Sequence, residues 1–147
     1  MINQAEQTIL DQAAAILERE IFGQQFTSPQ AVTRFLQFKI ATLEHEVFAV
    51  LFLNNQHSMI DFEIMFRGTV DSASVYPREV AKAALNKNAS AVIFAHNHPS
   101  DTSAPSMADK QITERLSKAL SLLEIRVLDH IIVARTSTTS FAELGLL

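Results

Sequence analysis

The sequence predicts an α/β fold in which a mixed β-sheet is flanked by helices. Two short and continuously apolar runs, Val47–Leu53 and Ala91–Ala95, are typical of strands that are buried on both faces. Segments with apolar residues at helical spacing lie before, between and after these runs, so strands and helices alternate along the chain. A length of 147 residues fits one such domain with a sizeable core.

The first elements expected are two helices. Apolar residues recur at helical spacing from Gln4 to Phe22, and Gly23 can end this helix. Ser28 followed by Pro29 predicts the N-cap and the first residue of a second helix, which runs to about Ile40. We expect a helical leader at residues 1–26, joined near residues 23–27 to a domain that spans residues 27–147.

The remaining elements are expected to alternate between strand and helix. Asn54 and Asn55 predict a turn after the first strand, and Pro77 predicts the start of a helix. We expect strands at residues 47–53, 58–66, 91–95 and 125–134, helices at residues 78–88 and 107–123, and a polar loop at residues 97–105.

The composition excludes several classes of protein. The absence of cysteine excludes disulfides, thiol catalysis and sulfur-ligated zinc, so a metal ion would need His, Asp, Glu or water as ligands. The formal net charge of −4 argues against a dedicated nucleic-acid binder, although it leaves room for a local basic patch. No apolar run approaches the ~20 residues that span a membrane, and the polar N-terminus does not resemble a signal peptide. We expect a cytoplasmic protein that does not enter membranes.

The segment that follows the second apolar run carries the most informative polar residues. His96 and His98 are two residues apart, so in extended backbone their imidazoles point the same way and can ligate one metal ion. Asp109, in the first turn of the next helix, is the natural third ligand. Ser106 and Asp109 also have the spacing of a helix N-terminal cap, and that purely structural role is compatible with metal binding.

A catalytic carboxylate could come from the first apolar strand. Glu46 precedes this strand directly, but composition alone favours a solvated strand end over a functional carboxylate. Glu44 and Glu63 are equally available by periodicity, so the residue pattern alone does not choose among the three.

The other polar residues have structural interpretations. His130 is expected to be a packed core histidine rather than a ligand, and Asn97 to hold its loop or to contact a substrate carbonyl, with the structural role favoured. Arg67 and Arg78 are expected on the solvated surface. His45 and His57 belong to no cluster that the sequence predicts.

These residues resemble a known family. Glu46, His96-Asn97-His98, seven intervening residues, Ser106 and then Asp109 are similar to the JAMM (MPN-plus) metalloprotease signature, and the chain resembles the RadC group of that superfamily from about Thr27 to its C-terminus. The strings that support this are Glu46–Leu53, Phe66–Thr69, Asp71–Val75, Pro77–Val80, Ala95–Ser100, Val127–Ile131 and Ser140–Glu143.

The resemblance implies a fold and a reaction. The fold would be a mixed β-sheet with flanking helices like that of cytidine deaminases. The protein would be a zinc metallohydrolase, a metallopeptidase or isopeptidase that cleaves an amide bond in a protein or peptide. His96, His98 and Asp109 would hold Zn²⁺, and Glu46 rather than Glu44 would be the catalytic carboxylate. Ser106 would donate a hydrogen bond to the oxyanion.

Two departures from the family and two rival functions stay open. Asp101 stands where the family usually has glycine, and no helix–hairpin–helix leader is matched. One rival is a DNA-repair factor or metal-dependent nuclease, as the family name suggests; the net acidity weighs against nucleic acid. The other is an inactive interaction scaffold, although all the motif positions are present. Deaminase activity would need a Cys-x-x-Cys motif that the chain lacks.

Overall fold

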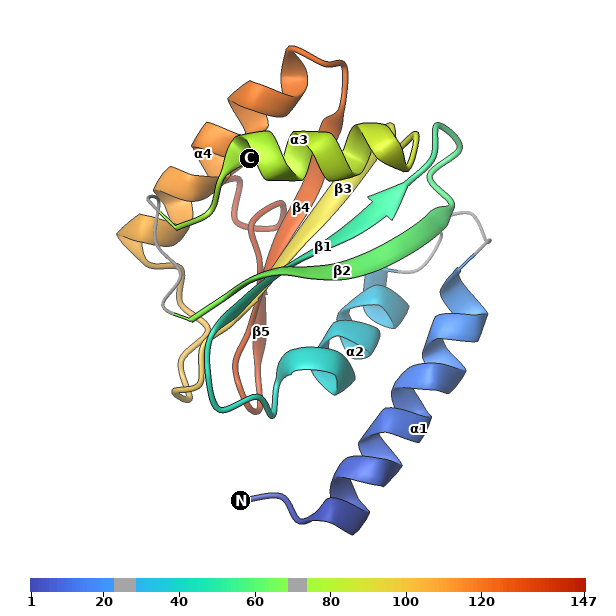
Figure 1. Cartoon of the computed structure of the whole chain (residues 1–147). Helices are drawn as coiled ribbons and strands as arrows, with labels where there is room; N and C mark the ends of the chain where they lie inside the picture. Colours follow the sequence, from blue (N-terminus) through green and yellow to red (C-terminus); the bar gives the residue numbers. More distant parts are fainter. Residues whose placement is uncertain (23–28, 69–73) are drawn as a thin grey trace.

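The computed structural model describes residues 1–22, 29–68 and 74–147 (Figure 1). The expected joint at residues 23–27, the Ser28 cap and part of the Asp71–Val75 string lie outside the described residues. No helix within these ranges is long and apolar enough to cross a membrane. The elements are α1 (Gln4–Ile21), α2 (Pro29–Ile40), β1 (Val47–Leu53), β2 (Met59–Arg67), α3 (Pro77–Asn86), β3 (Ala91–Asn97), α4 (Met107–Ser121), β4 (Arg126–Val133) and β5 (Thr138–Ser140).

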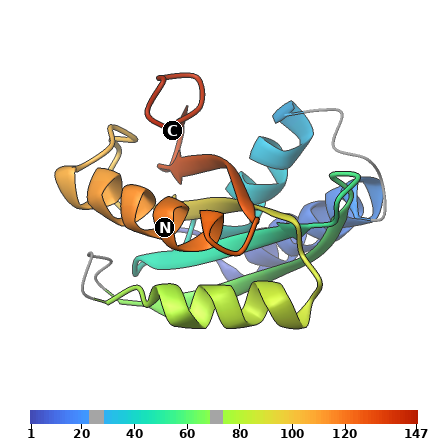
Figure 2. The same ribbon diagram turned by 90° about the horizontal axis from the view of Figure 1, so that it is seen from above.

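The strands form one mixed sheet in the order β2-β1-β3-β4-β5. β1 pairs antiparallel with both β2 and β3, β3 runs parallel to β4, and β5 pairs antiparallel with β4. The helix α4 makes the crossover between the two parallel strands. Helices α3 and α4 cover one face of the sheet, and α1 and α2 cover the other (Figures 1 and 2). The predicted fold class is confirmed.

The side chains of β3 point alternately to the two faces of the sheet. Ala91, Ile93 and Ala95 pack in the core cluster that includes α2. Val92 and Phe94 pack in the second cluster, with α3 and α4. Both β1 and β3 are buried along their whole length, as their apolar runs predicted. Continuing the alternation places His96 toward α4 and Asn97 toward the segment after α2.

Several sequence-based expectations need correction. β3 continues through His96 and Asn97, so the loop begins one residue later than expected. β5 was not predicted; it is three residues long and too short to show a clear period. The spacing that predicted α1 includes Ile9 and Ile16, yet these side chains are 62% and 51% exposed, because the inner side of this helix carries Ala14 and Ile21. 

The helices α3 and α4 end two residues earlier than predicted. After α3, Asn88 takes a left-handed backbone conformation with φ of 55°, and the amide of Ala89 bonds back to the carbonyl of Ala84. After α4, Glu124 does the same with φ of 59°, and the next amide bonds back to Leu120. Such endings usually use glycine, so the helical periodicity of these segments overestimated their length.

Candidate metal centre

Three side chains meet where β3 ends and α4 begins. His96 belongs to β3, His98 follows it, and Asp109 lies in the first turn of α4. Each residue offers one ligand atom, and these atoms lie within 4.8 Å of one another. Nδ1 of His96 is 2.9 Å from Oδ1 of Asp109, and Nε2 of His98 is 3.0 Å from Oδ2. The structure therefore brings together the three residues that the sequence pattern predicts as candidate ligands.

The helix cap positions Asp109. The Ser106 hydroxyl oxygen accepts from the Asp109 amide at 3.0 Å, and Oδ2 of Asp109 accepts from the Ser106 amide at 2.8 Å. This reciprocal pair is a capping box, so the structural interpretation of these two residues holds. Because the cap uses only a lone pair of the Ser106 hydroxyl, the hydroxyl hydrogen stays available to donate.

The backbone carbonyl of Thr102 determines which ring nitrogen of His98 carries a proton. Its Nδ1 lies 3.0 Å from the carbonyl oxygen of Thr102, which can only accept, so Nδ1 carries a proton. In the metal-free protein the hydrogen bond with Asp109 raises the pKa of His98, an effect that burial opposes in part. Loss of the second proton leaves a lone pair on Nε2 that points at the Asp109 carboxylate. A backbone carbonyl on one nitrogen and a ligand role on the other is the usual arrangement of a metal-binding histidine.

His96 is buried among acceptors without a satisfactory hydrogen bond. Its side chain is 2% exposed, and neither ring nitrogen has a hydrogen-bond partner of good geometry among the described residues. Both nitrogens nevertheless lie near carboxylates, Nδ1 near Asp109 and Nε2 at 3.6 Å from Oε2 of Glu46. A buried polar ring in this state needs a further partner. Two imidazoles and one carboxylate are the ligand types that zinc accepts, so the residues present fit such an ion.

The Asp109 carboxylate is held in its charged form. Burial raises its pKa, but close contacts with His96 and His98 and the hydrogen bond from the Ser106 amide outweigh burial and keep the pKa well below its usual range. A buried carboxylate that is ionised at neutral pH can act as an anionic ligand.

Of the three acidic residues that the sequence left open, the structure brings Glu46 to the cluster. Glu46 is half-buried, and its carboxylate approaches His96 as described above. Glu44 is exposed. Glu63 points to another part of the molecule, where its carboxylate lies 3.4 Å from the ammonium group of Lys87.

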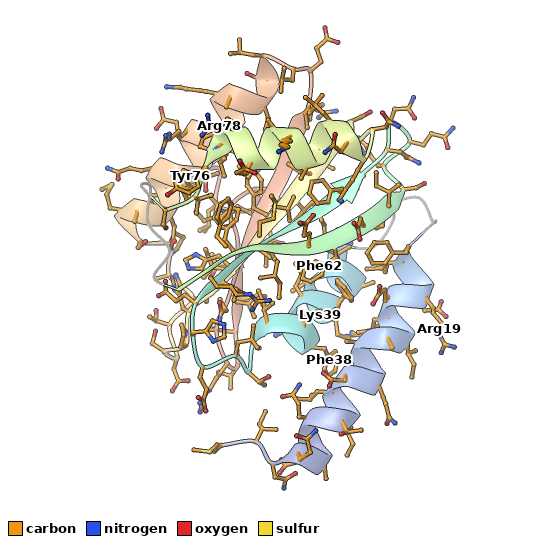
Figure 3. All side chains as sticks on the ribbon, in the orientation of Figure 1. Arg19, Phe38, Lys39, Phe62, Tyr76 and Arg78 are labelled. Carbon is orange, nitrogen blue, oxygen red and sulfur yellow. The ribbon has the colours of Figure 1, made fainter. Side chains whose placement is uncertain are left out.

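The remaining candidates lie outside the ligand group. His130 is fully buried and shares a hydrogen bond with Thr113, as expected of a packed core histidine. Arg67 is exposed, and Arg78 projects outward beside Tyr76 at the start of α3 (Figure 3). His45 is exposed, and His57, like His45, is not part of the ligand group.

Asp101 causes no visible strain at the position where the family usually has glycine. The described non-glycine residues with positive φ are His57, Asn88 and Glu124, so Asp101 does not use the left-handed region. Its side chain is exposed and is not part of the ligand group. Glycine's conformational freedom is therefore not needed at residue 101 in this chain.

Of two polar side chains behind the site, Thr113 was not assigned from the sequence, and Asn97 has other partners than expected. Thr113 lies one helical turn after Asp109, and its hydroxyl donates to the Asp109 carbonyl oxygen at 2.7 Å. Asn97 was expected to hold a loop, and it bonds to the segment before β1. The spacing of Thr113 four residues after a ligand is a usable signal, but the partners come from distant parts of the sequence.

Comparison with known proteins gives the family. The model of the RadC-like JAB domain matches residues 26–146. A UPF0758 protein of Vibrio cholerae serotype O1 is 59% identical over 141 residues, which are 95% of this chain and 89% of that protein. A UPF0758 protein of Methylibium petroleiphilum is 59% identical over 122 residues, 83% of this chain, and the match covers 55% of that longer protein. With a family model matched over most of its length, this chain belongs to the RadC family.

Proposed function

We propose that the protein is a zinc-dependent hydrolase of the JAMM type, a metallopeptidase or isopeptidase that cleaves an amide bond in a protein or peptide. One observation carries the proposal: His96, His98 and Asp109 present ligand atoms within 4.8 Å of one another, and the Glu46 carboxylate lies 3.6 Å from His96. Two histidines and one carboxylate leave a fourth position of a tetrahedral zinc ion open, which is the pattern of catalytic rather than structural zinc sites.

Each residue has a role that its contacts support. Bound zinc would lower the pKa of a water molecule to about 7 and polarise the substrate carbonyl. Glu46, half-buried and outside the ligand group, would take a proton from the water and deliver it to the leaving amine. Ser106 would donate its free hydroxyl hydrogen to the oxyanion, a contribution of about 3 kcal/mol by comparison with other oxyanion donors.

The test separates metal binding from chemistry. Protein purified without a metal-affinity tag is analysed for bound metal and assayed against a library of fluorogenic peptides. We expect one zinc per chain, loss of zinc in His98→Ala, and retention of zinc with loss of hydrolysis by about 10²–10⁴-fold in Glu46→Gln. Glu44→Gln is the matched control and is expected to behave as wild type, because Glu44 is exposed and outside the ligand group.

Three outcomes would count against the proposal. A wild-type chain that binds no zinc ends the metallohydrolase interpretation. A chain that binds zinc but hydrolyses no amide would favour an interaction scaffold, and salt-sensitive DNA binding or cleavage would favour the repair or nuclease interpretation.

A further inference from the structure

Asn97 lies between the two histidines of the proposed metal site, but its side chain points to the opposite face of the sheet. The residue is fully buried. Its Oδ1 accepts from the amide of Val47 at 2.7 Å, and its Nδ2 donates to the carbonyl oxygen of His45 at 3.0 Å. A longer contact of 3.5 Å joins Nδ2 to the carbonyl oxygen of Leu43. One amide side chain thus binds backbone groups that are about fifty residues away in the sequence.

Both strong bonds fall on the peptide groups that flank Glu46. The His45 carbonyl belongs to the peptide before Glu46, and the Val47 amide belongs to the peptide after it. On the other side, the Glu46 carbonyl accepts from the amide of Gly68 at 2.9 Å. The backbone of Glu46 is therefore held from two directions, by the side chain of Asn97 and by the end of β2.

The pairing of β1 with β3 does not provide the restraint on the Asn97 side. Backbone pairing between β1 and β3 ends at Phe48 and His96, so it stops before Glu46 is reached. Val47 is fully buried, and its amide would lack a partner on the β3 side without Asn97. Bonding to both the Val47 amide and the His45 carbonyl requires one acceptor and one donor on the same side chain, and the amide group of asparagine supplies both.

We propose that Asn97 is a positioning residue that fixes the Glu46 carboxylate relative to the metal ligands. The assignment rests on the function proposed above. His96 and His98 face the α4 side of the sheet, and the side chain of Asn97 faces the other side. The three consecutive residues thus supply two of the proposed ligands and the contact that holds the backbone of Glu46. An error in the position of Glu46 would weaken proton transfer while leaving the ligands in place.

The test compares Asn97→Ala with Asn54→Ala in the full chain. Asn54 is a matched control, because its side chain also bonds to two backbone groups but lies in the turn after β1, where its Oδ1 accepts from the amides of Gln56 and Ser58. In the cobalt-loaded protein, paramagnetic relaxation of the labelled Glu46 side chain reports its distance from the ion. Amide exchange at Val47 reports the hydrogen bond, and chelator competition reports zinc affinity.

The expected result is specific to Asn97. In Asn97→Ala the paramagnetic relaxation of Glu46 falls several-fold and Val47 exchanges faster, while the zinc Kd changes by less than the roughly tenfold seen for residues that bond directly to ligands. With a peptide substrate in hand, kcat falls with little change in KM, and the fall approaches the ~10²-fold contribution of a general base. Asn54→Ala leaves all four readouts at their wild-type values. Asn97→Ser, a milder change, replaces Asn97→Ala if that variant does not fold.

Two results would overturn the assignment or separate it from the proposed function. Wild-type relaxation of Glu46 in a folded Asn97 variant would show that Asn97 is only structural. If the wild-type chain took up no cobalt, the proposed function would fail. The Glu46–His96 separation in crystals of the metal-free wild type and variant would then decide whether Asn97 sets it, with an unchanged separation counting against the assignment.

Discussion

A buried hydrogen bond joins the hydroxyl of Thr113 to Nδ1 of His130, directly behind the ligand cluster. The same hydroxyl donates its one hydrogen to the carbonyl oxygen of Asp109. A carbonyl can only accept, so Thr113 must receive the Nδ1 proton of His130, and neutral His130 keeps a bare Nε2. Two hydrogen bonds in series therefore tie the first turn of α4 to β4. The carbonyl they reach belongs to a proposed metal ligand.

The first prediction concerns the hydroxyl of Thr113. Thr113→Val removes it without changing the side-chain shape and leaves the His130 donor unpaired, so we expect a loss of about 1–3 kcal/mol in the free energy of unfolding. We also expect about tenfold weaker zinc binding, because the helix turn that carries Asp109 loses an anchor. Thr113→Ser keeps the hydroxyl and should stay near wild type. Urea unfolding and chelator competition measure both effects; equal behaviour of the two variants would contradict the prediction.

The second prediction concerns acid sensitivity. Burial, and to a lesser degree the nearby His96, lower the pKa of His130 to about 3, against about 6.5 in the unfolded chain. The unfolded state therefore binds more protons between these values, so His130 contributes stability that is present above pH 6.5 and is lost as the pH falls toward 3. At pH 5 the loss is about 2 kcal/mol.

Replacing the imidazole of His130 should remove this acid sensitivity. In metal-free protein, the slope of unfolding free energy against pH between pH 6.5 and 4 should be smaller in His130→Gln than in wild type, whatever the variant's stability at neutral pH. Imidazole NMR shifts of wild-type His130 should show the neutral form at pH 5. A wild-type His130 that titrates near pH 6.5 would refute the assignment.

The third prediction concerns His98, whose shift has the opposite sign. Its pKa is raised in the metal-free protein chiefly by Asp109, so its contribution to stability is complete below pH 6.5 and is lost as the pH rises through the folded value. Asp109→Asn should move the pKa of His98 back toward 6.5, as followed by imidazole NMR. Asp101→Asn, which removes an exposed carboxylate of the same loop, is the control and should leave the titration of His98 in place.

The fourth prediction concerns metal addition and removal. Zinc at about one hundred times its Kd should stabilise the chain by about 2.7 kcal/mol, and a chelator should reverse the effect. For a domain of this size each kcal/mol corresponds to roughly 2–4 °C in Tm. His98→Ala should lose the zinc-dependent rise, whereas His45→Ala, which removes an exposed histidine, should keep it. A rise of equal size in both variants would place the zinc elsewhere.

The sequence predicted most of the fold because its signals are local. The apolar run of β1 has the bounds of the observed strand, Val47–Leu53, and Pro29 and Pro77 mark the starts of two helices. The ends of α3 and α4 were missed because Asn88 and Glu124 make left-handed turns without glycine. Local patterns predict where a helix can form, and here tertiary structure decides where it stops.

In the candidate site, too, local features could be predicted from the sequence and long-range contacts could not. His96 and His98 could be paired from their spacing, since two residues apart in a strand means one face. Periodicity treats Glu44 and Glu46 alike, so the proposal of Glu46 needed the family resemblance, and its approach to His96 is visible only in the structure. The bonds of Asn97 with Val47 and of Thr113 with His130 could not be predicted, since their partners are distant in sequence and meet only in the folded chain.

The two sheet pairings of β3 have a consequence for the order in which the protein folds. β3 pairs with β1 and, through the crossover of α4, with β4, and both pairings close long stretches of chain. Contacts of this kind form late, because the entropy of closing the chain must be overcome before they stabilise anything. The three proposed ligands lie close together in the sequence, whereas the Glu46 carboxylate reaches His96 only when β1 has paired with β3. Folding therefore completes the cluster in two stages, with the local residues of β3 and α4 first and Glu46 after them.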